Sequence, residues 1–192
     1  MAGPLQLKFV LSGDDVSALP ETSAEVAIVG RSNVGKSSLV NALSSRKRLA
    51  YVSKTPGRTR LLNLFSCDAG AVMDLPGYGY AAASKVVRAE WQQMIEAYLL
   101  QRENLVMIVV LVDGVVGPTK LDKQMLSWLR AFDLPHAVVA TKHDKVKPSK
   151  RENRKRELAE GCQLEKNDVV WVSSLKGTGV ETLRNLIRVW LV

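Results

Sequence analysis

The sequence predicts an α/β fold with a mostly parallel six-stranded sheet, one antiparallel strand and helices on both faces. Apolar runs rich in β-branched side chains alternate with helix-patterned segments along most of the 192 residues, which is typical of parallel strands joined by helices. The run at 105–112 is apolar throughout, as expected of a strand buried on both faces. The turn Asp68-Ala69-Gly70 joins two further runs and predicts a hairpin, which supplies the antiparallel strand.

Each expected element has its own pattern in the chain. Strands are expected at 26–29, 61–67, 71–75, 105–112, 136–140 and 168–172,. Helices are expected at 36–45, 88–101, 121–132, 149–160 and 180–191,. No repeat or second domain is visible, so we expect one domain over residues 1–192, with residues 1–22 as an N-terminal extension packed on it. The loops at 47–60 and 76–87 are poorly patterned, and functional loops are expected there,.

Composition limits the class of protein and of partner. The net charge of +8 and the pI near 9.6 favour a polyanionic partner such as nucleic acid,, although a merely soluble basic protein has the same balance. Cys67 and Cys162 lie far apart in no metal-ligand spacing, which argues against a disulfide framework or a zinc site. No apolar run is long enough to span a membrane and no signal peptide is recognisable,. We therefore expect a cytoplasmic protein without membrane association.

Residues 30–37 have the pattern G-x-x-x-x-G-K-[ST] of a phosphate-binding loop, or P-loop,. They lie between an expected strand and an expected helix, so backbone N–H groups at a helix N-terminus would face one concavity. Lys36 adds a charge for the β- and γ-phosphates, and the Ser37 hydroxyl is a ligand for Mg²⁺. A chance glycine turn is the alternative. The residues expected around the phosphates are Gly30, Arg31, Ser32, Asn33, Val34, Gly35, Lys36, Ser37 and Ser38.

The segment Asp74-Leu75-Pro76-Gly77 follows the third expected strand. A carboxylate at a strand end reaches Mg²⁺ through a water molecule in many nucleotide-binding proteins. Glycine has no side chain to keep a phosphate away, so the Gly77 N–H is expected to approach the γ-phosphate. Taken alone, the segment has the composition of an ordinary Pro-Gly turn.

Two further segments at strand ends predict recognition of guanine. The Asp144 carboxylate in Thr141-Lys142-His143-Asp144 has two acceptor oxygens, which match the paired N1–H and amino donors that guanine has and adenine lacks,. The Lys142 stem is expected to lie along the base. Backbone amides of the segment that includes Val172, Ser173 and Ser174 are expected to donate to the guanine O6. Each segment alone is a weak signal.

These four motifs stand in a fixed order, each at an expected strand end. Together with K-T-P-G-R-T at 54–59, D-L-P-G-Y-G-Y at 74–80 and S-S-L-K-G-T-G at 173–179, they make the chain resemble the EngB (YihA, YsxC) family of TrmE-Era-EngA-EngB-like bacterial GTPases over nearly its whole length. The resemblance implies a Ras-like P-loop GTPase domain that binds GTP, GDP and Mg²⁺. It also implies a role in assembling the large ribosomal subunit and a link to normal cell division and septation. We expect a monomer.

The resemblance also assigns the first loop. It implies that Thr59 binds Mg²⁺ in switch I, and Thr55 is the competing residue. A hydroxyl that binds Mg²⁺ only beside a γ-phosphate would order the loop with GTP and release it after hydrolysis. Lys36, Thr59 and Gly77 are then the expected catalytic residues. The nucleotide contacts expected in this loop are Gly57, Arg58, Thr59, Arg60 and Leu61.

The sequence departs from the Ras pattern at three positions. Tyr78 replaces the glutamine that orients the attacking water, so we expect an intrinsic rate on the order of 10⁻⁴ to 10⁻² s⁻¹,. A packed residue without a part in the chemistry is the other interpretation of Tyr78. Thr141 replaces the asparagine of the guanine motif, so we expect micromolar affinity. Asn33 resembles the asparagine of potassium-stimulated GTPases, and a loop asparagine bonded to its own backbone is the alternative,.

Basic residues are concentrated in two places. One set crowds residues 145–156 and comprises Lys145, Lys147, Lys150, Arg151, Arg154, Lys155 and Arg156. At helical spacing these residues form a stripe suited to rRNA phosphates, although a solvated charged face is the alternative. The second set flanks switch I and comprises Arg46, Lys47, Arg48, Lys54, Arg58 and Arg60.

Two classes of function fit these observations. The first is a slow GTPase that binds a pre-ribosomal particle when loaded with GTP and leaves after hydrolysis. The second is a non-catalytic, guanine-nucleotide-sensing RNA-binding module, since Tyr78 removes the obvious catalytic side chain. A P-loop ATPase or small-molecule kinase would require ATP to compete with GTP, which Asp144 argues against.

Overall fold

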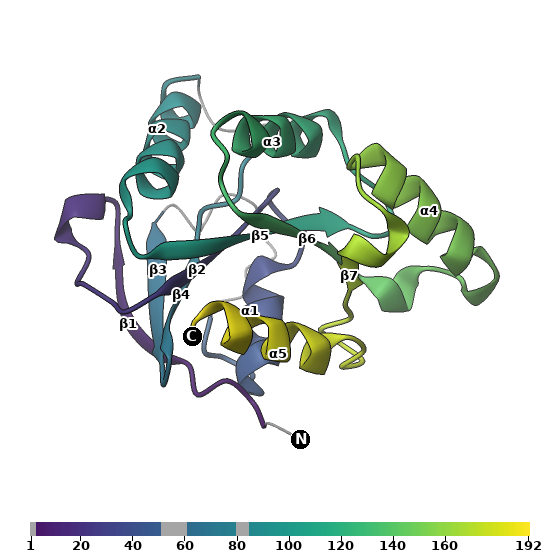
Figure 1. Cartoon of the computed structure of the whole chain (residues 1–192), viewed down its shortest axis with the longest axis horizontal. Coiled ribbons are helices and arrows are strands. Elements are labelled where there is room, and N and C mark those ends of the chain that lie inside the picture. Colours follow the sequence, from purple (N-terminus) through teal and green to yellow (C-terminus); the bar gives the residue numbers. More distant parts are fainter. Residues whose placement is uncertain (1–2, 51–60, 80–84) are drawn as a thin grey trace.

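A mixed sheet lies between two layers of helices in the computed structural model, which describes residues 3–50, 61–79 and 85–192 (Figure 1). The strands are β1 (Lys8–Gly13), β2 (Glu25–Gly30), β3 (Leu62–Cys67), β4 (Gly70–Asp74), β5 (Leu105–Asp113), β6 (His136–Thr141) and β7 (Val169–Trp171). The helices are α1 (Lys36–Ser44), α2 (Lys85–Gln101), α3 (Lys120–Ala131), α4 (Arg151–Gly161) and α5 (Val180–Trp190). Short 3₁₀ helices span Val16–Ala18, His143–Lys145, Pro148–Lys150 and Lys166–Asp168.

The sheet has the strand order β1-β3-β4-β2-β5-β6-β7. β3 runs antiparallel to both of its neighbours, β1 and β4, and every other pair is parallel. The predicted α/β class, the mostly parallel sheet and the antiparallel strand are therefore confirmed. The predicted strand count of six is one too low, because β1 extends the sheet beyond β3.

The sequence conceals β1 for a physical reason. Phe9 and Val10 are both exposed at the edge of the sheet, and the register between β1 and β3 shifts between Phe9 and Leu11. The bulge interrupts the alternation of apolar and polar residues by which a half-buried strand is recognised. The segment before β1 is also attached to the rest of the fold, since Leu5 and Leu7 are buried and the Leu5 N–H donates to the Leu43 carbonyl at 3.0 Å.

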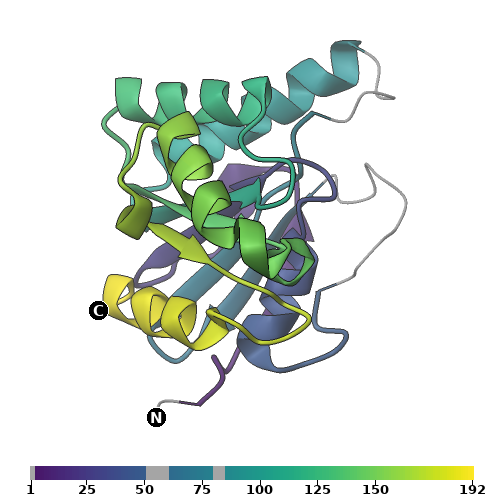
Figure 2. The same ribbon diagram turned by 90° about the vertical axis from the view of Figure 1, so that its right-hand side faces the viewer.

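Two apolar cores lie on the two faces of the sheet. α2, α3 and α4 pack on one face, where Tyr98, Leu126 and Leu158 are buried. α1 and α5 cover the other face with Leu39 and Ile187. Figures 1 and 2 show the two layers from directions at right angles. Helices on both faces are thus confirmed.

Glu25 joins the beginning of β2 to the end of α2. The Glu25 side chain is inaccessible to solvent and accepts hydrogen bonds from the Tyr98 hydroxyl at 2.5 Å and from Arg102 Nη2 at 2.6 Å. Burial alone would raise the pKa of Glu25, but the bonds from Arg102, Tyr98 and Thr22 outweigh it and lower the pKa,. The network fixes the end of the sheet opposite the P-loop.

The parallel strands end together at one edge of the sheet. The register pairs Ile28 with Asp74, Gly30 with Leu111, and Asp113 with Thr141. The segments that follow β2, β4, β5 and β6 therefore start side by side, where ligands bind in open α/β sheets. Within the ranges 3–50, 61–79 and 85–192, no helix combines the length and the apolar character that crossing a bilayer requires.

Candidate functional site

The P-loop turns from β2 into α1 through two residues in the left-handed region, Asn33 (φ 65°) and Gly35 (φ 111°). Gly35 is the residue before α1 and offers no side chain to cap it, and no acidic residue lies in the first helical turn. The N–H groups at the start of α1 therefore meet no carboxylate from their own helix. Such a helix N-terminus is suited to an anion, which is the ligand that the glycine pattern predicts.

Lys36, Ser37 and Asp74 lie together beneath this loop. The Lys36 side chain is buried, with Nζ 3.3 Å from the Gly30 carbonyl oxygen. Burial lowers the pKa of Lys36, and Asp74 opposes that shift. Burial raises the pKa of Asp74 to about 6, against the opposing effects of Lys36 and of a hydrogen bond from Ser37,.

The donor set at this point fits Mg²⁺. Asp74 Oδ1 is buried without a hydrogen-bond partner among the described residues, and the Ser37 hydroxyl contacts the same carboxylate. A buried carboxylate oxygen without a donor is rare in folded proteins, and hard oxygen ligands are those that Mg²⁺ prefers. Ser37 and Asp74 would hold the ion, and Asp74 would do so through a water molecule.

Gly77 rests directly on the P-loop. The Ser32 hydroxyl lies 3.3 Å from the Gly77 carbonyl oxygen, and the Ser32 N–H donates to the Tyr78 carbonyl at 3.0 Å. A Cβ atom at position 77 would lie 2.9 Å from Lys36 Nζ and 2.9 Å from both Cα and N of Ser32. Only glycine fits this approach, because two of those three atoms belong to backbone.

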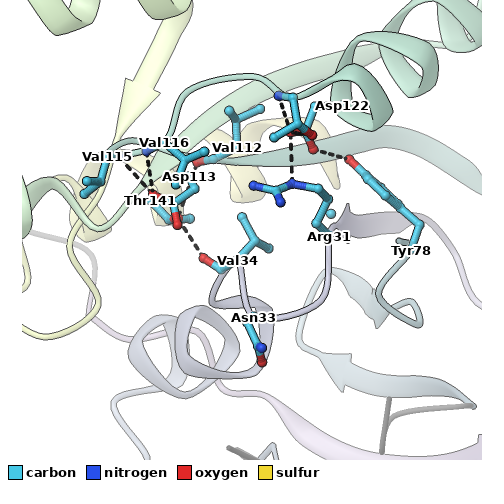
Figure 3. A network of polar contacts seen from close by, with 12 residues as sticks. Arg31, Asn33, Val34, Tyr78, Val112, Asp113, Val115, Val116, Asp122 and Thr141 are labelled. Carbon is cyan, nitrogen blue, oxygen red and sulfur yellow. Dashed lines mark hydrogen bonds and ion pairs between the residues drawn. The ribbon is translucent and has the colours of Figure 1, made fainter. Parts of the chain in front are cut away.

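The Tyr78 side chain is directed toward α3, where its hydroxyl donates to Asp122 Oδ1 at 2.9 Å (Figure 3). The other oxygen of Asp122 accepts from Arg31 Nε at 3.1 Å and from the N–H and hydroxyl of Thr119 at 2.8 and 2.7 Å. Burial and the neighbouring Asp122 raise the pKa of Tyr78 far above its ordinary value. Of the two interpretations of Tyr78, the geometry matches the packed residue.

Sequence reasoning missed Asp122, although a signal for it exists. Thr119 and Asp122 stand three residues apart at the beginning of α3, which is the spacing of a capping box,. That pattern identifies the start of the helix but not the partners of the carboxylate. Arg31 and Tyr78 lie 91 and 44 positions away from Asp122 in the chain, and only the fold brings them together.

The predicted base-recognition segment is attached to the back of the P-loop. Thr141 is buried, and its hydroxyl lies 2.7 Å from the Val34 carbonyl oxygen. Lys142 Nζ donates to the Asn33 carbonyl at 2.9 Å and pairs with Asp113 Oδ2 at 2.6 Å. Two of the residues predicted to contact the base thus also support the residues predicted to surround the phosphates.

Asp113, the last residue of β5, was also missed. Its Oδ1 accepts the N–H groups of Val115 and Val116 at 2.9 and 3.2 Å (Figure 3). Its Oδ2 accepts from Lys142 Nζ at 2.6 Å. Burial would raise the pKa of Asp113, but Lys142 and these N–H groups outweigh it and lower the pKa. An acidic residue that ends an otherwise apolar strand is the signal that could have found it.

Asp144 is held by the segment after β7. The Ser173 hydroxyl donates to Asp144 Oδ1 at 2.6 Å. The Ser173 N–H is already bonded to the Thr178 carbonyl at 2.9 Å, and the Val172 N–H to the Ala140 carbonyl at 2.8 Å. Among the described residues the N–H of Ser174 has no partner. Of the backbone N–H groups expected to donate to guanine, those of Val172 and Ser173 are therefore already bonded, and those of Ser174 and Leu175 remain. The Ser173 hydroxyl instead orients the Asp144 carboxylate.

The structure brings most of the predicted nucleotide contacts to one edge of the sheet. Ser38 and Ser174 line one cavity of about 470 Å³ between α1 and α5. Leu61 is partly exposed immediately before β3, and Leu75 and Pro76 are buried between Asp74 and Gly77. The predicted switch I residues lie outside the described part of the chain: Thr55, Gly57, Arg58, Thr59 and Arg60.

Comparison with known protein families identifies the class. The family described as 50S ribosome-binding GTPase matches residues 25–142. The chain is 44% identical over 180 residues to a probable GTP-binding protein EngB of Citrifermentans bemidjiense, covering 93% of this chain and 84% of that one. It is 45% identical over 179 residues to the protein of the same description from Azoarcus sp., covering 90% and 85% of the two chains.

Solved structures agree with the sequence relatives. A crystal structure of a probable GTP-binding protein engB matches with a TM-score of 0.72 and 25% identity, covering 88% of this chain and 98% of that chain. Era of Aquifex aeolicus bound to GDP·AlF4⁻ matches with a TM-score of 0.71 and 28% identity, covering 88% of this chain and 56% of that chain. Era in complex with MgGDPNP and nucleotides of 16S ribosomal RNA has a TM-score of 0.70 at 26% identity, over 87% and 56% of the two chains. The chain therefore belongs to the EngB family of GTP-binding proteins, which are GTPases.

Proposed function

We propose that this protein is a slow GTPase switch that acts in assembly of the large ribosomal subunit. In this proposal residues 1–192 form a single GTP-binding domain, with residues 1–22 packed on it as an extension. The observation that carries the proposal is the convergence of Lys36, Asp74 and Asp144 on one edge of the sheet. Those three side chains supply the chemistry for phosphate, metal and guanine at strand ends.

Each group has a distinct part in the proposed reaction. Lys36 and the N–H groups at the start of α1 bind the phosphates, and the Gly77 N–H would contact the γ-phosphate. Ser37 and Asp74 would hold Mg²⁺, joined by Thr59 of switch I, and the ion supplies charge neutralisation on the phosphate oxygens. Asp144 and Lys142 bind the base, and Thr141 supports the P-loop from behind.

A low rate follows from the position of Tyr78. Its hydroxyl is bonded to Asp122 and its ring has no amide with which to hold a water molecule. Unassisted GTPases turn over on the order of 10⁻⁴ to 10⁻² s⁻¹, and we expect this chain to do the same. Asn33 would add K⁺ as an activating ion. Equal turnover in potassium and sodium buffers, with and without ribosomes, would remove that part of the proposal.

The expected partner is rRNA of the large subunit or its precursor. Lys145, Lys147 and Lys150 are exposed along the segment that leads into α4, as is Arg156 within it. Arg154 and Lys155 pair instead with Glu157 and Glu152 at 3.2 and 3.1 Å. The positive stripe is therefore partly neutralised, and the exposed four are the groups available for phosphates. The proposed link to cell division and septation is either indirect, through defective division when ribosome assembly fails, or direct, through a separate partner.

Cosedimentation with separated ribosomal subunits tests the switch. The protein should sediment with large subunits in a non-hydrolysable GTP analogue and much less in GDP. Binding that ignores the nucleotide contradicts the switch. Phosphate release over several turnovers, stimulated by subunits, separates an enzyme from a nucleotide-sensing RNA-binding module, which would release none.

A further inference from the structure

We propose that Asp122 is a positioning residue for the GTPase reaction. Its carboxylate holds Arg31 of the P-loop and Tyr78 of switch II, the segment that follows β4, in one arrangement. It thereby sets the place of Gly77 beside Lys36. The inference rests on the proposed function, since it concerns the same reaction. None of the motifs of the nucleotide site includes Asp122, which lies in α3.

The carboxylate of Asp122 is buried and fully engaged in hydrogen bonds. Asp122 has no exposed surface, and its two oxygens accept four hydrogen bonds from three segments of the chain. The Arg31 guanidinium, at 3.1 Å, is the charge that balances it. A buried carboxylate without such a partner is strongly disfavoured. Removal of Asp122 would leave the Tyr78 hydroxyl and the Arg31 side chain without this acceptor.

Helix capping explains only the contacts with Thr119. In the capping box the Asp122 carboxylate accepts the Thr119 N–H at 2.8 Å and the Thr119 hydroxyl oxygen accepts the Asp122 N–H,. The same hydroxyl also donates to the carboxylate at 2.7 Å. Arg31 and Tyr78 add nothing to the cap, and both come from segments that the nucleotide site uses. Figure 3 shows their side chains converging on Asp122 from two sides. The carboxylate thus connects α3 to the P-loop and to switch II at a single point.

Tyr78 transmits this attachment to Gly77. Its backbone carbonyl accepts the Ser32 N–H at 3.0 Å, while its side chain is fixed to Asp122 at 2.9 Å. The residue is held at both ends, so the neighbouring Gly77 has little freedom to move from its place against Lys36 and Ser32. Correct placement of a group at the reacting phosphate is a large part of phosphoryl-transfer catalysis. The effect should appear wherever a γ-phosphate is involved and not with GDP.

The test compares D122N and Y78F with T119V, a matched control that removes a bond to the same carboxylate but belongs to the cap alone. For each protein we would measure single-turnover GTP hydrolysis, the affinities for GDP and a non-hydrolysable GTP analogue, and the melting temperature. D122N and Y78F should lose about tenfold in hydrolysis rate and shift the analogue-to-GDP affinity ratio at least threefold, with GDP affinity within twofold of wild type. T119V should lower the melting temperature and leave the ratio unchanged.

Two results would overturn the inference. One is a wild-type rate and affinity ratio in D122N and Y78F. The other is the same ratio shift in T119V, which would show that Asp122 acts through the cap. Failure of the proposed function looks different, because the wild-type protein itself would then release no phosphate. The affinity ratio would still test Asp122 in that case.

Discussion

At the scale of single residues, the site is defined by close approaches that tolerate little change. Gly77 contacts the P-loop so closely that any Cβ would collide with Lys36 Nζ and the Ser32 backbone. Lys142 is held at 2.6 Å by a carboxylate that lies outside the recognised motifs. Such contacts join segments distant in sequence. Substitutions at these positions should therefore change nucleotide affinity more than they change the stability of the fold.

Gly77→Ala should weaken binding of a non-hydrolysable GTP analogue about tenfold or more, with little change for GDP. The added methyl group would displace the segment from Lys36, and in the proposed function both residues contact the γ-phosphate,. Titration with fluorescent nucleotides measures both affinities. Gly13→Ala is the control, since its Cβ would meet only Leu11 Cδ1 at 3.8 Å. An equal loss for GDP and the analogue would contradict the expected selectivity.

Asp113→Asn should lower GDP affinity about tenfold. The substitution removes the charge that fixes Lys142, and a hydrogen bond to a charged group contributes roughly 1.5–3 kcal/mol. Stopped-flow release of a fluorescent GDP analogue would show the loss as faster dissociation. Glu152→Gln, which breaks exposed pairs with Lys155 and Lys166, should leave GDP affinity unchanged. Unaltered release from the Asp113 variant would mean that Lys142 needs no such support.

At the scale of elements, strands buried on both faces were predictable, and of the two edge strands β7 was predicted but β1 was not. β5 is a continuous apolar run and could be found from its composition,. β1 exposes most of its residues and contains a bulge, so its pattern carries little information. The P-loop could be predicted because its sequence pattern is local and contiguous,. Asp113 and Asp122 could not be assigned their partners, since those contacts depend on how α3, β5 and β6 lie against the P-loop.

Glu25→Gln should cost about 3 kcal/mol of stability at neutral pH, because it leaves Arg102 without its buried partner,. The folded pKa of Glu25 lies below its unfolded value of 4.5, so its contribution is complete above that pH and is lost as the pH falls toward the folded value. The difference between wild type and variant should therefore shrink below about pH 4.5.

Urea unfolding at pH 7, 5 and 4 measures this difference directly. Glu103→Gln is the matched control, because Glu103 is exposed and adjacent to Arg102 in sequence. A constant difference between wild type and the Glu25 variant across this range would show that the charge of Glu25 does not stabilise the fold.

At the scale of the whole molecule, the chain carries a net charge of +8, and some of its basic side chains are paired with carboxylates while others are exposed. On α4 the ion pairs of Arg154 and Lys155 reduce the charge that a polyanion would meet. Composition predicted a basic surface, but it could not tell which side chains are neutralised within the molecule.

Replacement of Lys145, Lys147 and Lys150 by alanine should weaken binding to large ribosomal subunits and leave GDP affinity unchanged. Each phosphate contact that is lost should lower the slope of log K against log salt by about one. Replacement of Lys155, already paired with Glu152, should have a smaller effect. An unchanged salt dependence in the triple variant would place the RNA contact elsewhere.

The contacts of Thr141 and Lys142 with Val34 and Asn33 have a consequence for fidelity. Because the proposed base-recognition segment supports the loop proposed to surround the phosphates, a nucleotide whose base binds Asp144 poorly would also have its phosphates held less well. The protein would then discriminate between bases twice, once when the nucleotide binds and again when it is hydrolysed. ITP, which lacks the amino group of guanine, should show a lower kcat as well as a higher KM. A change in KM alone would mean that recognition of the base does not influence hydrolysis at the phosphates.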